Sequence, residues 1–269
     1  MLKPLYSGIN YEKEYVPLLT EIHRSYTHRL GPGELPGRRK DTERIYAVVV
    51  PHSSYAFAGP GMAWGYKMLS EHYFPETYVL LIPSSKENSP ICVVDEDFES
   101  AFGVCFVDNI FVNKLLETGL VSRAENVDEL ALELQIPFLQ QASRDRLKLL
   151  KVLPLIVSSS SLKKLAETLV QIKKDIVVII ASDFVIGASS EGDLIGHDKQ
   201  LIQYILRFDI GGFEKYIEKH NISLPSKNVF SLGIEILKQL GVNQGEVVNY
   251  YNSGEIGSEE SKSFVSLVF

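Results

Sequence analysis

Side chains that could carry out chemistry directly follow three apolar segments of the sequence. They are an imidazole, two hydroxyls and a carboxylate, supplied by His52, Ser84, Ser85 and Asp183. Uninterrupted apolar segments that are rich in β-branched residues indicate strands covered on both faces. Because ligands of open α/β sheets bind beyond the carboxyl ends of the strands, we expect these four side chains to share one pocket.

Two kinds of reaction centre could be built from these residue types. A metal site needs about three or four ligands of the His, Cys, Asp or Glu type, and His52 and Asp183 are candidates. A hydrolytic site could use Ser84 or Ser85 as nucleophile, His52 as base and Asp183 to orient the base. The absence of a G-x-S-x-G elbow counts against hydrolysis. Structural roles are equally open, since a lone histidine is commonly a hydrogen-bonded structural residue and Asp183 could cap a helix.

Two charged clusters also allow a functional or a structural interpretation. Glu129 and Glu133 are four residues apart, so on a helix their carboxylates share one face. Paired carboxylates can perform acid–base catalysis, but exposed surface acids have the same spacing. The basic loop at residues 37–40 contains Arg39 and could contact an anion, although we interpret it as a solvated turn.

The elements that position these residues alternate between apolar strands and amphipathic helices. The core strands are expected at residues 46–50, 78–82, 149–156 and 176–181. Helices are expected at residues 15–26, 109–119, 127–143, 161–174, 198–207, 210–220 and 228–241. A hairpin at 91–107, strands at 247–251 and 264–269, and a Gly59-Pro60-Gly61 turn before another apolar helix complete the pattern. This alternation predicts an α/β protein, and without a linker or repeat we expect one domain, residues 1–269.

Composition argues against several classes of protein. The 269 residues include 27 Lys and Arg against 34 Asp and Glu, and the resulting net charge of −7 argues against nucleic-acid binding. The two cysteines, Cys92 and Cys105, are too few for a disulfide framework. No stretch approaches the roughly 18 apolar residues of a membrane span, and the first residues lack the apolar core of a signal peptide. We therefore expect a cytoplasmic protein that binds neither nucleic acid nor membrane.

With these residues in view, the sequence resembles the Memo family along nearly its whole length. Six segments are similar to motifs of that family, in the same order: residues 3–11, 50–60, 82–85, 129–138, 182–184 and 251–254. The second segment, which contains His52, is similar to the family's A-P-H-A-G-Y motif. Members of the family share the fold of class III (LigB-type) extradiol dioxygenases. The resemblance therefore implies an α/β domain with a central mixed, mostly parallel sheet flanked by helices.

The resemblance also implies a metal site of two histidines and one cysteine, and this sequence departs from it. His52 matches the first histidine, but Ser85 stands at the position of the second. The cysteine segment corresponds to residues 224–228, which contain no thiol. Two further histidine positions hold apolar residues: Leu130, and Val185 or Ile186. Changes around a metal site typically cost roughly 10–100-fold in affinity, and lost ligands cost more, so we expect a degenerate site that binds no cofactor.

This loss predicts a pseudoenzyme, a divergent Memo-like protein that acts by binding, as a non-catalytic structural partner. Its partner would be another protein, a second copy of the chain in a homo-oligomer, or an intact Memo-like paralogue. A third possibility is a groove in which Lys86 and Lys227, near the former metal positions, bind a carboxylate or phosphate.

The alternative interpretation is an enzyme. A metal-dependent oxidoreductase similar to non-heme dioxygenases would need iron, copper or zinc in a site rebuilt from His52, Asp183 and Glu133. A less favoured version is a metal-free hydrolase with Ser85 as its nucleophile. The oxidoreductase predicts activity that chelators abolish, and the hydrolase predicts covalent labelling of the serine.

Overall fold

The computed structural model describes the chain except residues 86–88, 126, 128, 159–161, 186–190 and 258–261. The helices are α1 (Tyr15–Thr27), α2 (Tyr55–Glu71), α3 (Asn109–Glu117), α4 (Leu130–Ala142), α5 (Leu162–Ile172), α6 (Glu191–Leu206), α7 (Ile210–His220) and α8 (Lys227–Gln239). The strands are β1 (Ala47–Val50), β2 (Thr77–Pro83), β3 (Cys92–Val93), β4 (Phe98–Ser100), β5 (Gly103–Val107), β6 (Ser122–Arg123), β7 (Lys151–Val157), β8 (Ile176–Ala181), β9 (Phe184–Val185), β10 (Glu246–Asn252) and β11 (Lys262–Val268).

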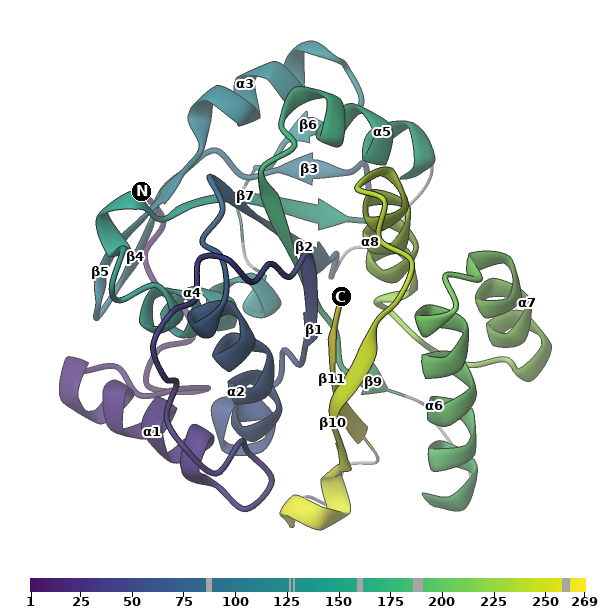
Figure 1. Cartoon of the computed structure of the whole chain (residues 1–269), viewed down its shortest axis with the longest axis horizontal. Coiled ribbons are helices and arrows are strands. Elements are labelled where there is room, and N and C mark those ends of the chain that lie inside the picture. Colours follow the sequence, from purple (N-terminus) through teal and green to yellow (C-terminus); the bar gives the residue numbers. More distant parts are fainter. Residues whose placement is uncertain (86–88, 126, 128, 159–161, 186–190, 258–261) are drawn as a thin grey trace.

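A mixed sheet occupies the centre of the molecule (Figure 1). Its main path runs β10-β11-β1-β8-β2-β7-β3-β6. The middle strands β1, β8, β2 and β7 are parallel to one another, and nearly every residue in them is buried. Burial on both faces is the reason that their sequences are uninterrupted apolar segments. The expected α/β architecture in a single domain is confirmed.

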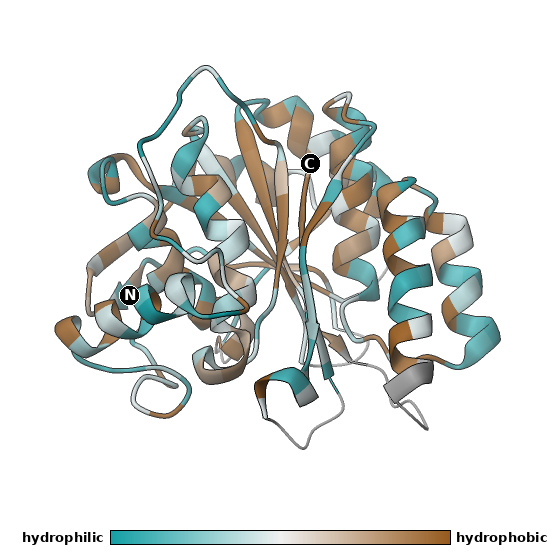
Figure 2. Cartoon of the chain, turned by 60° about the horizontal axis from the view of Figure 1, so that its bottom comes forward, coloured by the Kyte–Doolittle hydropathy of each residue, from teal (hydrophilic) through white to brown (hydrophobic). Residues whose placement is uncertain are grey.

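Helices cover both faces of this sheet. Helices α2 and α4 pack on one face with α1 outside α2, while α8 packs on the other face beside α5. Figure 2 shows the apolar strands edge-on between these two helical layers. The pair α6 and α7 lies at the outer right of Figure 1, next to α8. In the described part of the chain, no helix is long and apolar enough to cross a membrane.

The turn expected at Gly59-Pro60-Gly61 is wrong, because these residues lie inside α2. The glycines permit close packing instead. A Cβ atom on Gly59 would lie 2.3 Å from Oγ of Ser25 in α1, and one on Gly61 would lie 2.8 Å from Cγ of Pro51. Contacts this close exclude a side chain, so the glycines let α2 approach α1 and the end of β1.

The hairpin expected at residues 91–107 is present only in part. Strands β4 and β5 form an antiparallel pair, but β3 pairs with β7 and β6 instead. Strand β5 in turn runs parallel to β7. At the other edge of the sheet, β11 lies antiparallel between β1 and β10. The parallel core is therefore bordered by antiparallel strands on both sides, a common arrangement in large α/β sheets.

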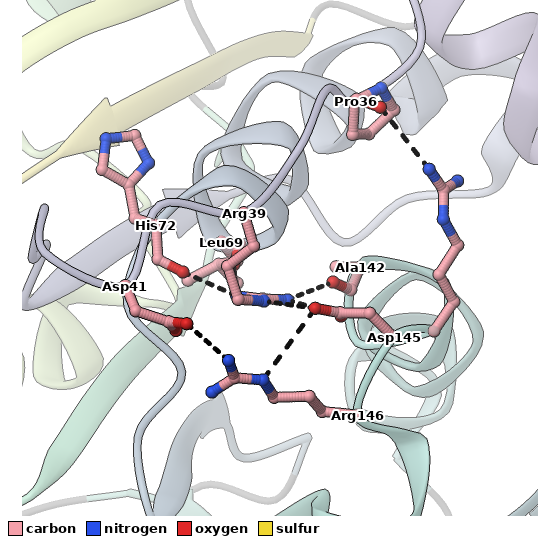
Figure 3. A network of polar contacts seen from close by, with 9 residues as sticks. Pro36, Arg39, Asp41, Leu69, His72, Ala142, Asp145 and Arg146 are labelled. Carbon is pink, nitrogen blue, oxygen red and sulfur yellow. Dashed lines mark hydrogen bonds and ion pairs between the residues drawn. The ribbon is translucent and has the colours of Figure 1, made fainter.

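Arg39 does not lie in a solvated turn, contrary to our expectation for the basic loop. Its side chain is only 4% exposed, and its guanidinium donates hydrogen bonds to the carbonyl oxygens of Leu69, His72 and Ala142 and to the carboxylate of Asp145 (Figure 3). These bonds tie the loop to the carboxyl ends of α2 and α4. Arg39 therefore satisfies helix-terminal carbonyl groups that would otherwise be buried without a donor.

Candidate functional site

The ends of β1 and β8 bring His52 and Asp183 together. The two strands are neighbours in register, with Val50 opposite Ala181, so the residues that follow them meet. The backbone N–H of His52 donates to Oδ1 of Asp183 at 2.8 Å, and the backbone N–H of Asp183 donates to Nδ1 of His52 at 3.2 Å. The hydroxyl of Ser53 donates to the second oxygen, Oδ2, of the same carboxylate.

These contacts determine what the His52 ring can do. A backbone N–H can only donate, so Nδ1 of His52 must be the acceptor in this contact. The proton of the neutral ring is then on Nε2, which makes Nε2 a donor. Neither nitrogen presents a free lone pair in this arrangement, although a metal ligand needs one.

A pocket of about 330 Å³ opens beside this pair. Its lining combines hydrogen-bonding and apolar side chains: Asn10, His52, Ser53, Ser54, Phe57, Leu130, Asp183, Ser253, Lys262 and Phe264. Leu130 stands here at a position where the resemblance implies a histidine. Asn10, Ser253 and Lys262 were not among the predicted site residues. Asn10 and Ser253 lie in the family-like segments 3–11 and 251–254, whereas Lys262 belongs to no motif.

Ser84 and Ser85 do not share this pocket, contrary to the expectation of one common site. Ser84 lines a neighbouring pocket of about 340 Å³, together with Glu129. The hydroxyl of Ser85 donates to the carboxylate of Glu129 at 3.0 Å and not to a histidine. The physical reason is strand order, since β8 separates β1 from β2, and residues 129 and 130 line the two different pockets.

Glu133 holds the N-terminal segment and does not join His52. Its carboxylate accepts the backbone N–H groups of Leu5 at 2.7 Å and Tyr6 at 2.9 Å and the hydroxyl of Tyr11 at 2.8 Å. Burial, together with this carboxylate, raises the pKa of Tyr11 well above its ordinary value, so the phenol remains a donor. Glu133 is therefore committed to structural hydrogen bonds with the N-terminal segment.

Only one of the two lysines proposed as anion ligands lies within the described residues. Lys86 lies outside the described residues. Lys227 is exposed at the start of α8 and is not among the residues that line the His52 pocket. The residue before it, Ser226, is buried and lies with its hydroxyl 2.5 Å from that of Ser182. This contact connects the segment at residues 224–228, where the resemblance implies a cysteine ligand, to Ser182, the residue before Asp183.

The residues in place do not fit the metal site that the resemblance implies. Among the side chains that the structure describes, no group of three or more His, Cys, Asp or Glu residues is arranged to hold an ion. Cys105 is buried, and burial raises the pKa of its thiol to about 12. Cys92 lines the pocket that contains Ser84 rather than the one that contains His52. We therefore assign no chemistry to an iron, copper or zinc ion at His52.

Comparison with known proteins identifies the family. The family model described as Memo-like protein matches residues 3–268. A MEMO1 family protein of Methanopyrus kandleri is 26% identical, over 99% of this chain and 98% of its own. Similar proteins of Methanococcus maripaludis and Sulfolobus acidocaldarius are 27% and 26% identical, each over 96% of this chain and over 95% and 94% of their own. The chain therefore belongs to the Memo family.

Proposed function

We propose that this Memo-family chain is a non-catalytic binding protein whose His52 pocket holds no metal. The observation that carries the proposal is the reciprocal pair of hydrogen bonds between His52 and Asp183. These bonds occupy the ring of His52, the one histidine that matches the metal site implied by the family resemblance. Restoring a ligand there would require the ring to break its contact with the backbone and would leave a buried N–H without an acceptor, at a cost of about 1–3 kcal/mol.

The other positions at which the resemblance implies metal ligands favour the same proposal. Leu130 has no lone pair, Ser85 is bonded to Glu129, and Ser226 is bonded to Ser182. A single remaining imidazole is one ligand, whereas a catalytic or structural zinc site takes three or four from the protein. The scaffold around these residues is intact, so binding without turnover is the role it supports best.

A protein partner is the class of ligand that we propose. Four large apolar side chains near the N-terminus are between 53% and 79% exposed: Leu5, Ile9, Tyr15 and Val16. Because all four lie within residues 5–16, we propose this segment as the surface that contacts another protein. A second copy of this chain would supply the same surface, and an intact Memo-family protein is the other proposed partner.

Elemental analysis of the purified protein tests the metal-free pocket. We expect no iron, copper or zinc whose binding depends on His52. A stoichiometric metal that is lost in His52→Ala would overturn the proposal. A metal that stays bound in His52→Ala is held elsewhere and supports the proposal.

Light scattering of the same sample tests the proposed partner. It should give a mass above that of one chain, either alone or after mixing with an intact family member. A strict monomer in both cases would contradict the proposed partner.

A further inference from the structure

Two histidine rings contact each other across the hairpin of α6 and α7. His197 lies within α6 and His220 is the last residue of α7, at nearly equal distances along the chain from the turn at Phe208. The centres of their rings are 5.2 Å apart, with the ring planes at 60°. His197 is half-buried and His220 is exposed, so solvent and ions can reach the pair.

This separation suits the coordination of one ion by both rings. Zinc lies about 2.0–2.1 Å from an imidazole nitrogen, which places the ion roughly 3.2 Å from the ring centre. Two rings that meet at the tetrahedral angle then have centres roughly 5.2 Å apart. We propose that His197 and His220 form a binding site for a divalent transition ion such as zinc, with water in the remaining positions.

Tyr216 fixes the orientation of both rings and is a positioning residue in this site. Its hydroxyl lies 2.9 Å from Nδ1 of His197, and its ring lies against that of His220 with centres 4.3 Å apart. The oxygen of a tyrosine hydroxyl can accept the Nδ1 proton of His197. Nε2 of His197 then has a free lone pair, which is the arrangement found when a coordinating histidine donates its other N–H to a neighbour.

The turn and a second aromatic contact hold the two helices in this position. The backbone N–H of Asp209 donates to the carbonyl of Tyr204 at 2.9 Å, and the Tyr204 ring lies 5.8 Å from that of Tyr216. The ligands are therefore presented by helices whose relative position does not depend on an ion. Two imidazole ligands favour zinc, copper or nickel over magnesium and calcium, which prefer oxygen ligands.

This site is independent of the proposed function, because it uses neither His52 nor its pocket. Zinc titration at neutral pH, in competition with a chromophoric chelator, measures it directly. We expect one zinc per chain in the wild type and loss of that zinc in both His197→Ala and His220→Ala. His28→Ala is the matched control, because this histidine accepts a backbone N–H from Leu30, and it should leave zinc binding unchanged. Magnesium should not compete.

Tyr216→Phe separates a positioning role from a purely structural one. It keeps the ring against His220 but removes the hydroxyl, and we expect one zinc still to bind with roughly 10-fold lower affinity.

His220→Ala removes an exposed side chain at a helix end, so the variant should fold, and an unchanged circular dichroism spectrum would verify this. Zinc binding that persists in folded His220→Ala overturns the proposal. Zinc lost only in His52→Ala overturns both this proposal and the metal-free pocket, whereas no zinc binding at all overturns this one alone.

Discussion

Two histidine clusters of this chain differ in the partner of one ring nitrogen. At the ends of β1 and β8, Nδ1 of His52 accepts a backbone N–H from Asp183. In the α6–α7 hairpin, Nδ1 of His197 lies against the hydroxyl of Tyr216, which can accept a proton. The backbone N–H of Asp183 leaves Nε2 of His52 as a hydrogen-bond donor. The hydroxyl of Tyr216 can leave Nε2 of His197 free to bind a metal ion. The value of a histidine for metal binding thus depends on what its other nitrogen contacts.

The two clusters also differ in what their contacts support. The bonds of His52 and Asp183 involve backbone atoms that follow two neighbouring core strands. The contacts of His197 and Tyr216 join side chains of two outer helices. Substitutions in the first cluster should therefore change the free energy of unfolding, while substitutions in the second should change the affinity for an ion.

The largest expected effect is that of Asp183→Ala. The substitution leaves the backbone N–H of His52 and the hydroxyl of Ser53 without their acceptor, in a place where Asp183 is only 4% exposed. Each unsatisfied buried donor costs about 1–3 kcal/mol, so we expect a loss of about 3 kcal/mol in the free energy of unfolding. Urea denaturation measures it.

Asp183→Asn is the matched control for this change. The amide retains an oxygen that can accept from the backbone of His52, so it should lose less than half as much stability as Asp183→Ala. If both variants were as stable as the wild type, the contacts of Asp183 would not support the fold, and the comparison between the clusters would fail.

The next effect concerns Asp198, which follows His197 on α6 but faces the sheet. It is fully buried, and the hydroxyl of Tyr250 donates to its Oδ2 at 2.9 Å. Burial raises the pKa of its carboxyl from 3.8 to about 6, although hydrogen bonds from Ser263 and Tyr250 partly oppose the shift. We expect Asp198→Asn to be more stable than the wild type by roughly 2 kcal/mol at pH 7, as measured by urea denaturation.

The direction of the pH dependence follows from the raised pKa. As pH rises from about 4 to about 6, the unfolded chain loses this proton before the folded chain does, so the wild type loses stability across that window. The advantage of Asp198→Asn should therefore vanish below about pH 4. Asp209→Asn, an exposed N-cap at which asparagine caps equally well, should not alter the profile. A constant advantage of Asp198→Asn at all pH values would refute the titration of Asp198.

Elements whose signal is local were predictable from the sequence. The apolar segment of β8 and the helical pattern of α7 were expected with the bounds that the structure has, because burial of a strand or of one helix face dictates local periodicity. The meeting of His52 and Asp183 was expected for the right reason, since both follow core strands. The prediction that Ser85 shares the His52 pocket was wrong because periodicity does not reveal strand order, and β8 lies between β1 and β2.

Features that depend on distant parts of the chain could not be predicted. The burial of Arg39 requires the carboxyl ends of two helices to meet above it, and nothing in its loop indicates this. Gly59 indicated a turn, because the contact with Ser25 that it permits exists only once two helices pack. The pair of His197 and His220 depends in the same way on the antiparallel hairpin, since neither residue belongs to a spaced ligand motif.

The smallest expected effect, and the one that tests the comparison most directly, is that of His52→Ala against His52→Asn. Alanine removes the acceptor of the Asp183 N–H, so we expect a loss of about 1 kcal/mol in the free energy of unfolding. The side-chain oxygen of asparagine lies near the position of Nδ1 and can accept the same N–H, so His52→Asn should recover most of the loss. Urea denaturation of the two variants side by side measures the difference. Equal losses would mean that the fold uses the bulk of the ring rather than its Nδ1 acceptor, and His52 would then be as free to bind an ion as His197.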